Sequence, residues 1–102
     1  MGKNRDRESL IRLLVNITVH EIVMKNTNRP ESKHFLSSEI IEYSGQTEKM
    51  KKLHIWNEDD KTYIKEKALR KIKEKMNFKY PDILFSIKEA ENLLDKKINE
   101  MT

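Results

Sequence analysis

The chain has 102 residues, of which 36% are hydrophobic and 37% are charged, and its formal net charge is +4 at pH 7. A chain of this length fits one domain, residues 1–102. Two glycines and two prolines are too few for the many turns of an all-β fold, and the absence of cysteine excludes disulfides, thiolate metal sites and cysteine nucleophiles. The sequence therefore predicts an all-α protein, a small single-domain bundle of about five helices.

Residues 9–24 are the most apolar stretch and predict the first helix, behind a flexible segment at residues 1–6. At helical spacing this stretch has one apolar stripe and, beside it, a second stripe made of Ile11, Val15, Val19 and Ile22. A helix with two apolar stripes touches two neighbours, or one neighbour and a partner chain. A strand remains an alternative for residues 15–20, because apolar and polar side chains alternate there.

Start signals predict three further helices, at residues 30–44, 48–55 and 57–76. Pro30 suits a first helical position, Thr47 is a capping residue, and Asn57 precedes three acidic residues that favour the positive end of a helix. Gly45 is predicted to be the left-handed C-cap that separates the first two of these helices. The apolar residues expected in their cores include Phe35, Leu36, Ile40, Ile41, Met50, Leu53, Ile64, Ala68, Leu69, Ile72 and Met76.

The C-terminal part of the chain predicts a fifth helix. Pro81 interrupts the preceding helix, and residues 82–85 fit either a short extended segment or a turn of helix. Ser86 with Glu89 three residues later is a capping-box pattern, so the last helix is predicted to begin there. Residues 100–102 are expected to fray.

The second stripe of the first helix is the predicted contact surface. A bundle of amphipathic helices with this modest apolar content does not clearly need a helix that is apolar on two sides. We therefore predict a non-enzymatic helical protein that self-associates as a homo-oligomer or binds a protein partner. The residues assigned to this interface are Ile11, Val15, Val19 and Ile22.

The alternative is a nucleic-acid-binding accessory protein. Residues 61–79 carry a net charge of +6, which leaves −2 for the rest of the chain, and localised positive charge is typical of nucleic-acid binding. Residues 36–53 have the gross pattern of a degenerate helix-turn-helix around Gly45, although Ile41 and Gln46 fit that motif poorly. The residues assigned to nucleic acid are Lys49, Lys51, Lys52, Lys67, Arg70, Lys71 and Lys73.

The competing and more common explanation of such a basic segment is a solvated helix, whose lysines are neutralised by acidic faces of neighbouring helices. Three aromatic residues near the segment, Tyr63, Phe78 and Tyr80, have the chemistry to stack on bases. Packing in the core or at its edge is expected for each of them instead.

No catalytic, cofactor or metal site is predicted. Glu31 and His34 have the spacing of one half of a carboxylate-bridged di-metal site, but the second Glu-x-x-His that such a bundle needs is missing. The apolar stretch is too short to span a bilayer and contains Arg12, which argues against a membrane segment. The charged N-terminus lacks the pattern of a signal peptide, so a cytoplasmic protein is expected.

Overall fold

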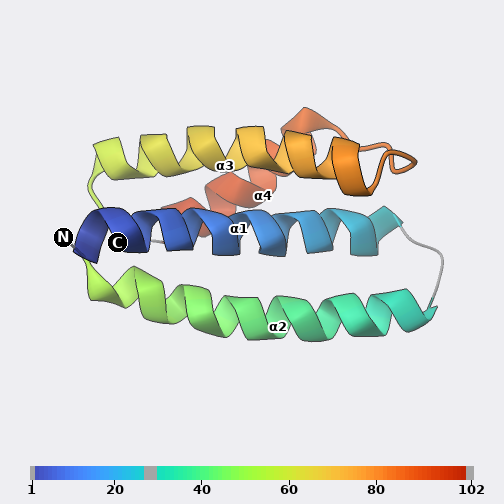
Figure 1. The fold of residues 1–102 in the computed structure, drawn as a ribbon, viewed down its shortest axis with the longest axis horizontal. Coiled ribbons are helices and arrows are strands. Elements are labelled where there is room, and N and C mark those ends of the chain that lie inside the picture. The colour runs from blue at the N-terminus through green and yellow to red at the C-terminus, as the bar shows by residue number, and fades with distance from the viewer. Residues whose placement is uncertain (1, 27–29, 101–102) are drawn as a thin grey trace.

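The protein consists of α-helices arranged around the first of them (Figure 1). The structure is a computed structural model that describes residues 2–26 and 30–100, without the side chains of residues 30–32. In chain order the helices are α1 (Gly2–Asn26), α2 (Pro30–Leu53), α3 (Glu58–Lys79) and α4 (Ile87–Asn99). The predicted all-α class is confirmed, and the described residues form four helices, not about five.

α1 is the central helix, since it packs against each of the other three. Figure 1 shows α3 and α2 on either side of α1 and α4 behind it. Residues 15–20 lie within this helix, so the strand alternative for them is wrong. Residues 2–6, expected to be flexible, are the first turns of α1 and are tied to other elements by ion pairs such as Lys3 with Asp60 and Asp6 with His54.

α2 is one continuous helix where the sequence predicted two. Gly45 does not have a positive φ and therefore is not a C-cap, and Thr47 is not an N-cap, since its hydroxyl donates to the carbonyl of Tyr43 at 2.8 Å within the helix. A glycine inside a helix costs only about 1 kcal/mol, and packing of α2 along α1 offsets that cost. Because no proline follows Pro30 within α2, nothing else interrupts it.

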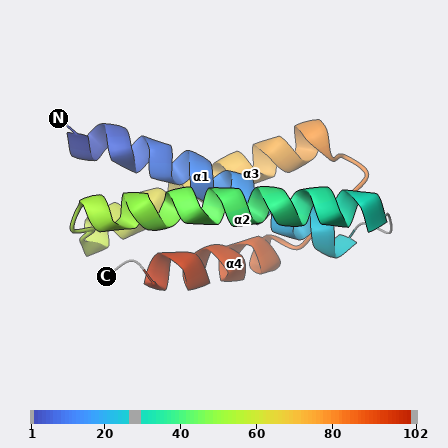
Figure 2. The same ribbon diagram turned by 90° about the horizontal axis from the view of Figure 1, so that it is seen from below.

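α2 packs closely against α1 alone. Only the side facing α1 is covered, so Leu36 is buried while Phe35, Ile41 and Leu53, which were expected in the core, are exposed. Figure 2 shows α2 in front, with α4 beside it and α1 and α3 behind. An ion pair of Lys51 with Glu100, 3.8 Å apart, links α2 to the C-terminal end of the described residues.

The starts of α3 and α4 confirm Asn57 and Ser86 as the capping residues, although a full capping box is present only at α3. Asn57 and Asp60 form a capping box: the side chain of Asn57 accepts from the backbone N–H of Asp60 at 2.8 Å, and the Asp60 carboxylate accepts from that of Asn57 at 3.2 Å. The side chain of Ser86 accepts from two backbone N–H groups at the start of α4. Residues 81–86 between the two helices form a turn and a loop, neither strand nor helix.

One hydrophobic core is shared by α1, α3 and α4, with Leu36 of α2 and Trp56 at its edges. Apolar residues at helical spacing supply it, as the sequence predicted for Ile64, Ala68 and Ile72. α4 covers one face of the α1–α3 pair, whereas no described helix covers the opposite face (Figure 2). α4 ends at Asn99, and the predicted fraying of residues 101–102 lies outside the described residues.

Candidate nucleic-acid interface

The predicted protein interface on α1 lies inside the protein. Ile11, Val15, Val19 and Ile22 are each 5% exposed or less, because α2, α3 and α4 surround the middle of α1. The second apolar stripe therefore packs against the chain's own helices, and its residues are not available to a partner in this fold. The prediction of a contact surface was based on a second apolar stripe that needed a partner, and in this fold the chain's own helices are that partner.

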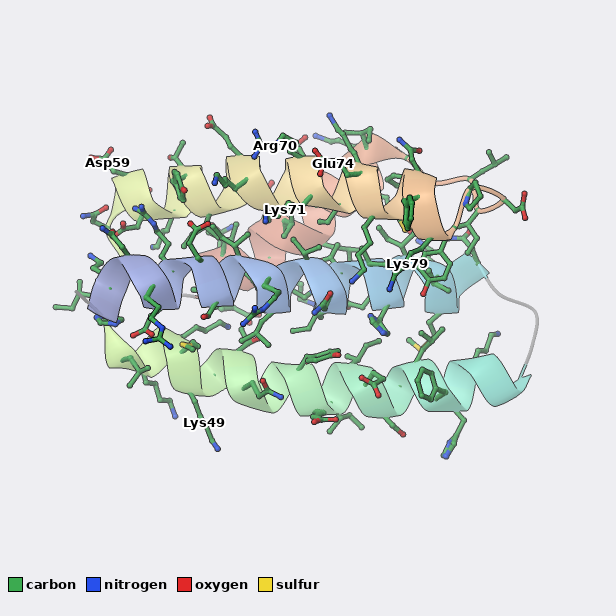
Figure 3. The ribbon with its side chains drawn as sticks, viewed as in Figure 1. Lys49, Asp59, Arg70, Lys71, Glu74 and Lys79 are labelled. Atoms are coloured by element: carbon green, nitrogen blue, oxygen red, sulfur yellow. The ribbon has the colours of Figure 1, made fainter. Side chains whose placement is uncertain are left out.

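The residues predicted to bind nucleic acid fall into two groups that the fold separates. Lys49, Lys51 and Lys52 belong to α2, whereas the other four belong to α3, on the far side of α1. Figure 3 shows Lys49 and Arg70 pointing away from the molecule in opposite directions. Lys51 is also largely buried and paired with Glu48 at 3.0 Å. Because α2 has no turn at Gly45, the helix-turn-helix prediction is wrong.

Part of the basic segment on α3 is neutralised, as the solvated-helix explanation requires. Lys65 is paired with Asp95 at 2.9 Å and with Glu91 at 3.3 Å, both on α4. The hydrogen bond to Asp95, reinforced by Glu91, raises the pKa of Lys65 despite its partial burial. Lys61 and Lys67 each have a carboxylate at 3.7 Å, from Glu58 and Glu8.

Five cations of the segment have no such partner. Among the side chains that the structure describes, no carboxylate lies within 4.0 Å of Arg70, Lys71, Lys73, Lys75 or Lys79. Residues 67–79 contain a single acidic residue, Glu74, and it lies with Arg70 on the outer side of α3 in Figure 3. Lys71 and Lys79 lie on the side of α3 that faces α1. Lys61, Lys65 and Lys67 in the first half of the basic helix are therefore neutralised, whereas the cations from Arg70 onward have no carboxylate partner among the described side chains.

On that uncovered face, α1 and α3 form a groove of about 690 Å³, which we call the basic groove. One wall is the polar strip of α1, in which Arg5, Ser9, Arg12 and Asn16 recur at helical spacing. The other wall is α3. The residues that line the groove are Arg5, Glu8, Ser9, Arg12, Val15, Asn16, Lys71 and Lys75. Four cations from two helices thus converge with one carboxylate among them.

Lys75 has the most unusual environment in the basic groove. Its Nζ donates to the side-chain carbonyl of Asn16, which is uncharged, and no described carboxylate neutralises it. Burial, together with the nearby positive charge of Lys79, lowers the pKa of Lys75. The fold therefore holds a partly desolvated ammonium beside other cations, an arrangement that an anionic ligand would relieve.

The opposite arrangement occurs where the start of α3 meets the start of α1. There the carboxylate of Asp60, only 9% exposed, pairs with Lys3 at 2.8 Å and with Arg7 at 3.1 Å. The hydrogen bond from Lys3 is the main reason that the pKa of Asp60 is lowered, with further contributions from the backbone of Asn57 and from Arg7. We call Lys3, Arg7, Asn57 and Asp60 the Asp60 network.

The sequence predicted one of the four cations of the basic groove, Lys71, and missed the other three: Arg5, Arg12 and Lys75. Lys75 lies in the basic segment 61–79 but was not among the residues assigned to nucleic acid. Arg5 and Arg12 lie on α1, for which the apolar stripes, and not the polar face, were considered as a contact surface. Their spacing of seven residues, two helical turns, is a signal that they share one face, but only the packing of α3 beside that face shows that it is the wall of a groove.

Nothing in the described part of the chain adds a metal site or a membrane span. No group of three or more His, Asp or Glu side chains there is placed to hold a metal ion, and the side chain of Glu31 lies outside the described residues. None of the described helices is long and apolar enough to cross a bilayer. No protein-family model, curated protein or solved structure matches this chain.

Proposed function

We propose that the protein is a non-enzymatic nucleic-acid-binding protein and that the basic groove holds the phosphate backbone. The observation that carries this proposal is the convergence of Arg5, Arg12, Lys71 and Lys75 from two helices, with one lining carboxylate, Glu8. Polyanion binding uses such surfaces because cations that neutralise phosphates release condensed counterions. Lys75 strengthens the proposal, since a desolvated cation without a counterion is otherwise a cost to folding.

Self-association, the other function predicted from the sequence, has less support. Its stripe on α1 is buried. The exposed apolar side chains of α2 do not replace it. Phe35 and Ile41 point about 120° away from each other around the helix, and Leu53, on the same side as Phe35, lies about five turns farther along. Apolar side chains scattered singly on a surface are ordinary. The charged groove is therefore the better-defined binding surface.

The test is a fluorescence-anisotropy titration of labelled oligonucleotides, single-stranded and duplex, at low salt and then at rising salt. The double variant Lys71→Gln/Lys75→Gln is expected to weaken binding and to reduce the slope of log K against log salt by about 1.5 to 2, because two phosphate contacts are lost. Arg5→Gln/Arg12→Gln is expected to do the same from the other wall of the groove.

The matched control is Lys49→Gln/Lys52→Gln, which removes the same charge from the exposed face of α2. It is expected to leave binding nearly unchanged. The proposal fails if no oligonucleotide binds at low salt, if the control weakens binding as much as the groove variants, or if anionic lipid vesicles bind more tightly than every oligonucleotide. Urea unfolding of each variant confirms that binding is measured on folded protein.

A further inference from the structure

The three aromatic residues near the basic helix differ in what surrounds them. The ring of Tyr63 lies under the guanidinium of Arg7, whose carbon is 4.0 Å from the ring centre, and its hydroxyl donates to Glu8 at 3.0 Å. Tyr80 packs against the core and ends α3. Phe78 instead is 86% exposed. Tyr63 also packs against the edge of the core, so the expectation of core or edge packing holds for Tyr63 and Tyr80 and is wrong for Phe78.

Phe78 is also in register with the cations of the groove. It follows Lys71 by seven residues, or two turns, so the two side chains leave α3 within about 20° of each other and about 10 Å apart along the axis. It follows Lys75 by three residues, which places the two on neighbouring positions of one face. The ring therefore extends the wall of the basic groove toward the C-terminal end of α3.

An exposed apolar residue alone carries no function. Leu84 and Ile55 are each 88% exposed, but both lie outside the helices and neither lines the groove. What distinguishes Phe78 is an aromatic ring on the same helix face as two lysines without a described carboxylate partner. Flat rings beside a cationic track are the combination by which proteins bind single strands, because bases stack on the ring while phosphates meet the cations.

We propose that the ligand of the basic groove is single-stranded nucleic acid and that Phe78 is the residue on which a base stacks. This inference rests on the proposed function and narrows its substrate class. A duplex buries the faces of its bases, so the ring can contribute to binding of a single strand only. The chemistry is shared by DNA and RNA, since both offer phosphates and unpaired bases.

The experiment compares three ligands of about 15 nucleotides: oligothymidine, oligouridine and a DNA duplex of equal length. Each is titrated with the wild-type protein and with Phe78→Leu, which keeps an apolar side chain and removes the aromatic ring. The matched control is Phe35→Leu, the same change at an exposed phenylalanine of α2. Circular dichroism and urea unfolding verify that all three proteins are folded.

We expect single strands to bind at least about tenfold more tightly than the duplex, and Phe78→Leu to weaken single-strand binding at least about fivefold while leaving duplex binding unchanged. Phe35→Leu is expected to change neither. Oligothymidine and oligouridine affinities show which sugar is preferred. Equal affinity for strand and duplex, or no effect of Phe78→Leu, overturns this inference and leaves the nucleic-acid function standing. Absence of binding to all three ligands overturns both.

Discussion

α1 and α3 form two charged regions that differ in whether their cations are paired with a carboxylate. In the Asp60 network, two cations of α1 converge on a buried carboxylate that also caps α3. In the basic groove, cations of α1 and α3 face one another with Glu8 as the only carboxylate among the lining residues. Ion pairs thus join the two helices at one end, whereas farther along they present a groove lined mostly by cations.

The two regions differ in whether a buried charge has a partner of opposite sign, and under the proposed function the cations of the groove serve binding. Burial of a charge is tolerated when a partner neutralises it and satisfies its hydrogen bonds, as Lys3 and Arg7 do for Asp60. Lys75 is partly buried without a carboxylate partner, and the uncharged side chain of Asn16 accepts its hydrogen bond, so holding its charge there costs stability. A natural reason to keep such a residue is a ligand of opposite charge.

Removing the central charge of the Asp60 network is expected to have the largest effect on stability. Asp60→Asn leaves two half-exposed cations without their counterion and weakens the capping box, which we expect to lower the free energy of unfolding by about 2 kcal/mol. Urea unfolding measures this. Asp59→Asn, a change at the neighbouring exposed position, is the control, with an expected effect within about 0.5 kcal/mol.

The lowered pKa of Asp60 also predicts that the free energy of unfolding decreases at acid pH. Because the folded-state pKa of Asp60 is lowered, its contribution is fully present above the unfolded carboxyl pKa of about 3.9 and is lost as the pH falls through the lowered pKa. Asp60→Asn lacks this contribution at every pH, so the difference between the two proteins should shrink on acidification. A difference that persists at low pH would show that the amide disturbs packing instead.

The reverse result is expected for the basic groove. Lys75→Met removes a partly desolvated cation and keeps the length of the side chain, so it should raise the free energy of unfolding by up to about 1 kcal/mol at neutral pH while weakening nucleic-acid binding. Lys71→Met, at an exposed position of the same wall, is expected to weaken binding without this gain in stability. Destabilisation by Lys75→Met would contradict the contrast between the two regions.

The lowered pKa of Lys75 also predicts that its contribution to the free energy of unfolding changes at alkaline pH. The folded-state pKa of Lys75 is lowered, so the unfolded chain holds more protons and stability rises with pH between that lowered value and the unfolded pKa of about 10.4. Lys75→Met should lack this rise. Lys65 acts in the opposite direction, since its raised pKa means that its contribution is present below the unfolded pKa and lost as the pH rises through the raised value.

The smallest expected effect tests whether Glu8 belongs to the binding surface. Glu8→Gln removes the one lining carboxylate and leaves an acceptor for the hydroxyl of Tyr63. We expect affinity for nucleic acid to increase about two- to threefold, the size of one surface charge interaction. Glu66→Gln, the same change at an exposed position of α3 that does not line the groove, should leave affinity unchanged. Anisotropy titration measures both, and equal effects would place Glu8 outside the binding surface.

Local features of the sequence were enough to predict most of the helices. Asn57 and Ser86 start α3 and α4 because their side chains satisfy backbone N–H groups a few residues away. Pro30 is the first residue of α2, a position that proline favours because its fixed φ suits a helix. Gly45 misled the prediction because a glycine permits a turn without requiring one, and the packing of α2 along α1 decided between the two.

The sequence by itself determined that the chain is helical, that α1 has two apolar stripes and that positive charge gathers in α3, since these follow from composition and spacing along one element. Only the tertiary structure decided what covers α1, because Ile11 and Val15 are equally apolar whether another helix or another chain buries them. It also decided which cations are neutralised. Lys65 and Lys71 look alike in sequence, but α4 brings Asp95 to the first, whereas the second faces Arg5 and Arg12 across the basic groove.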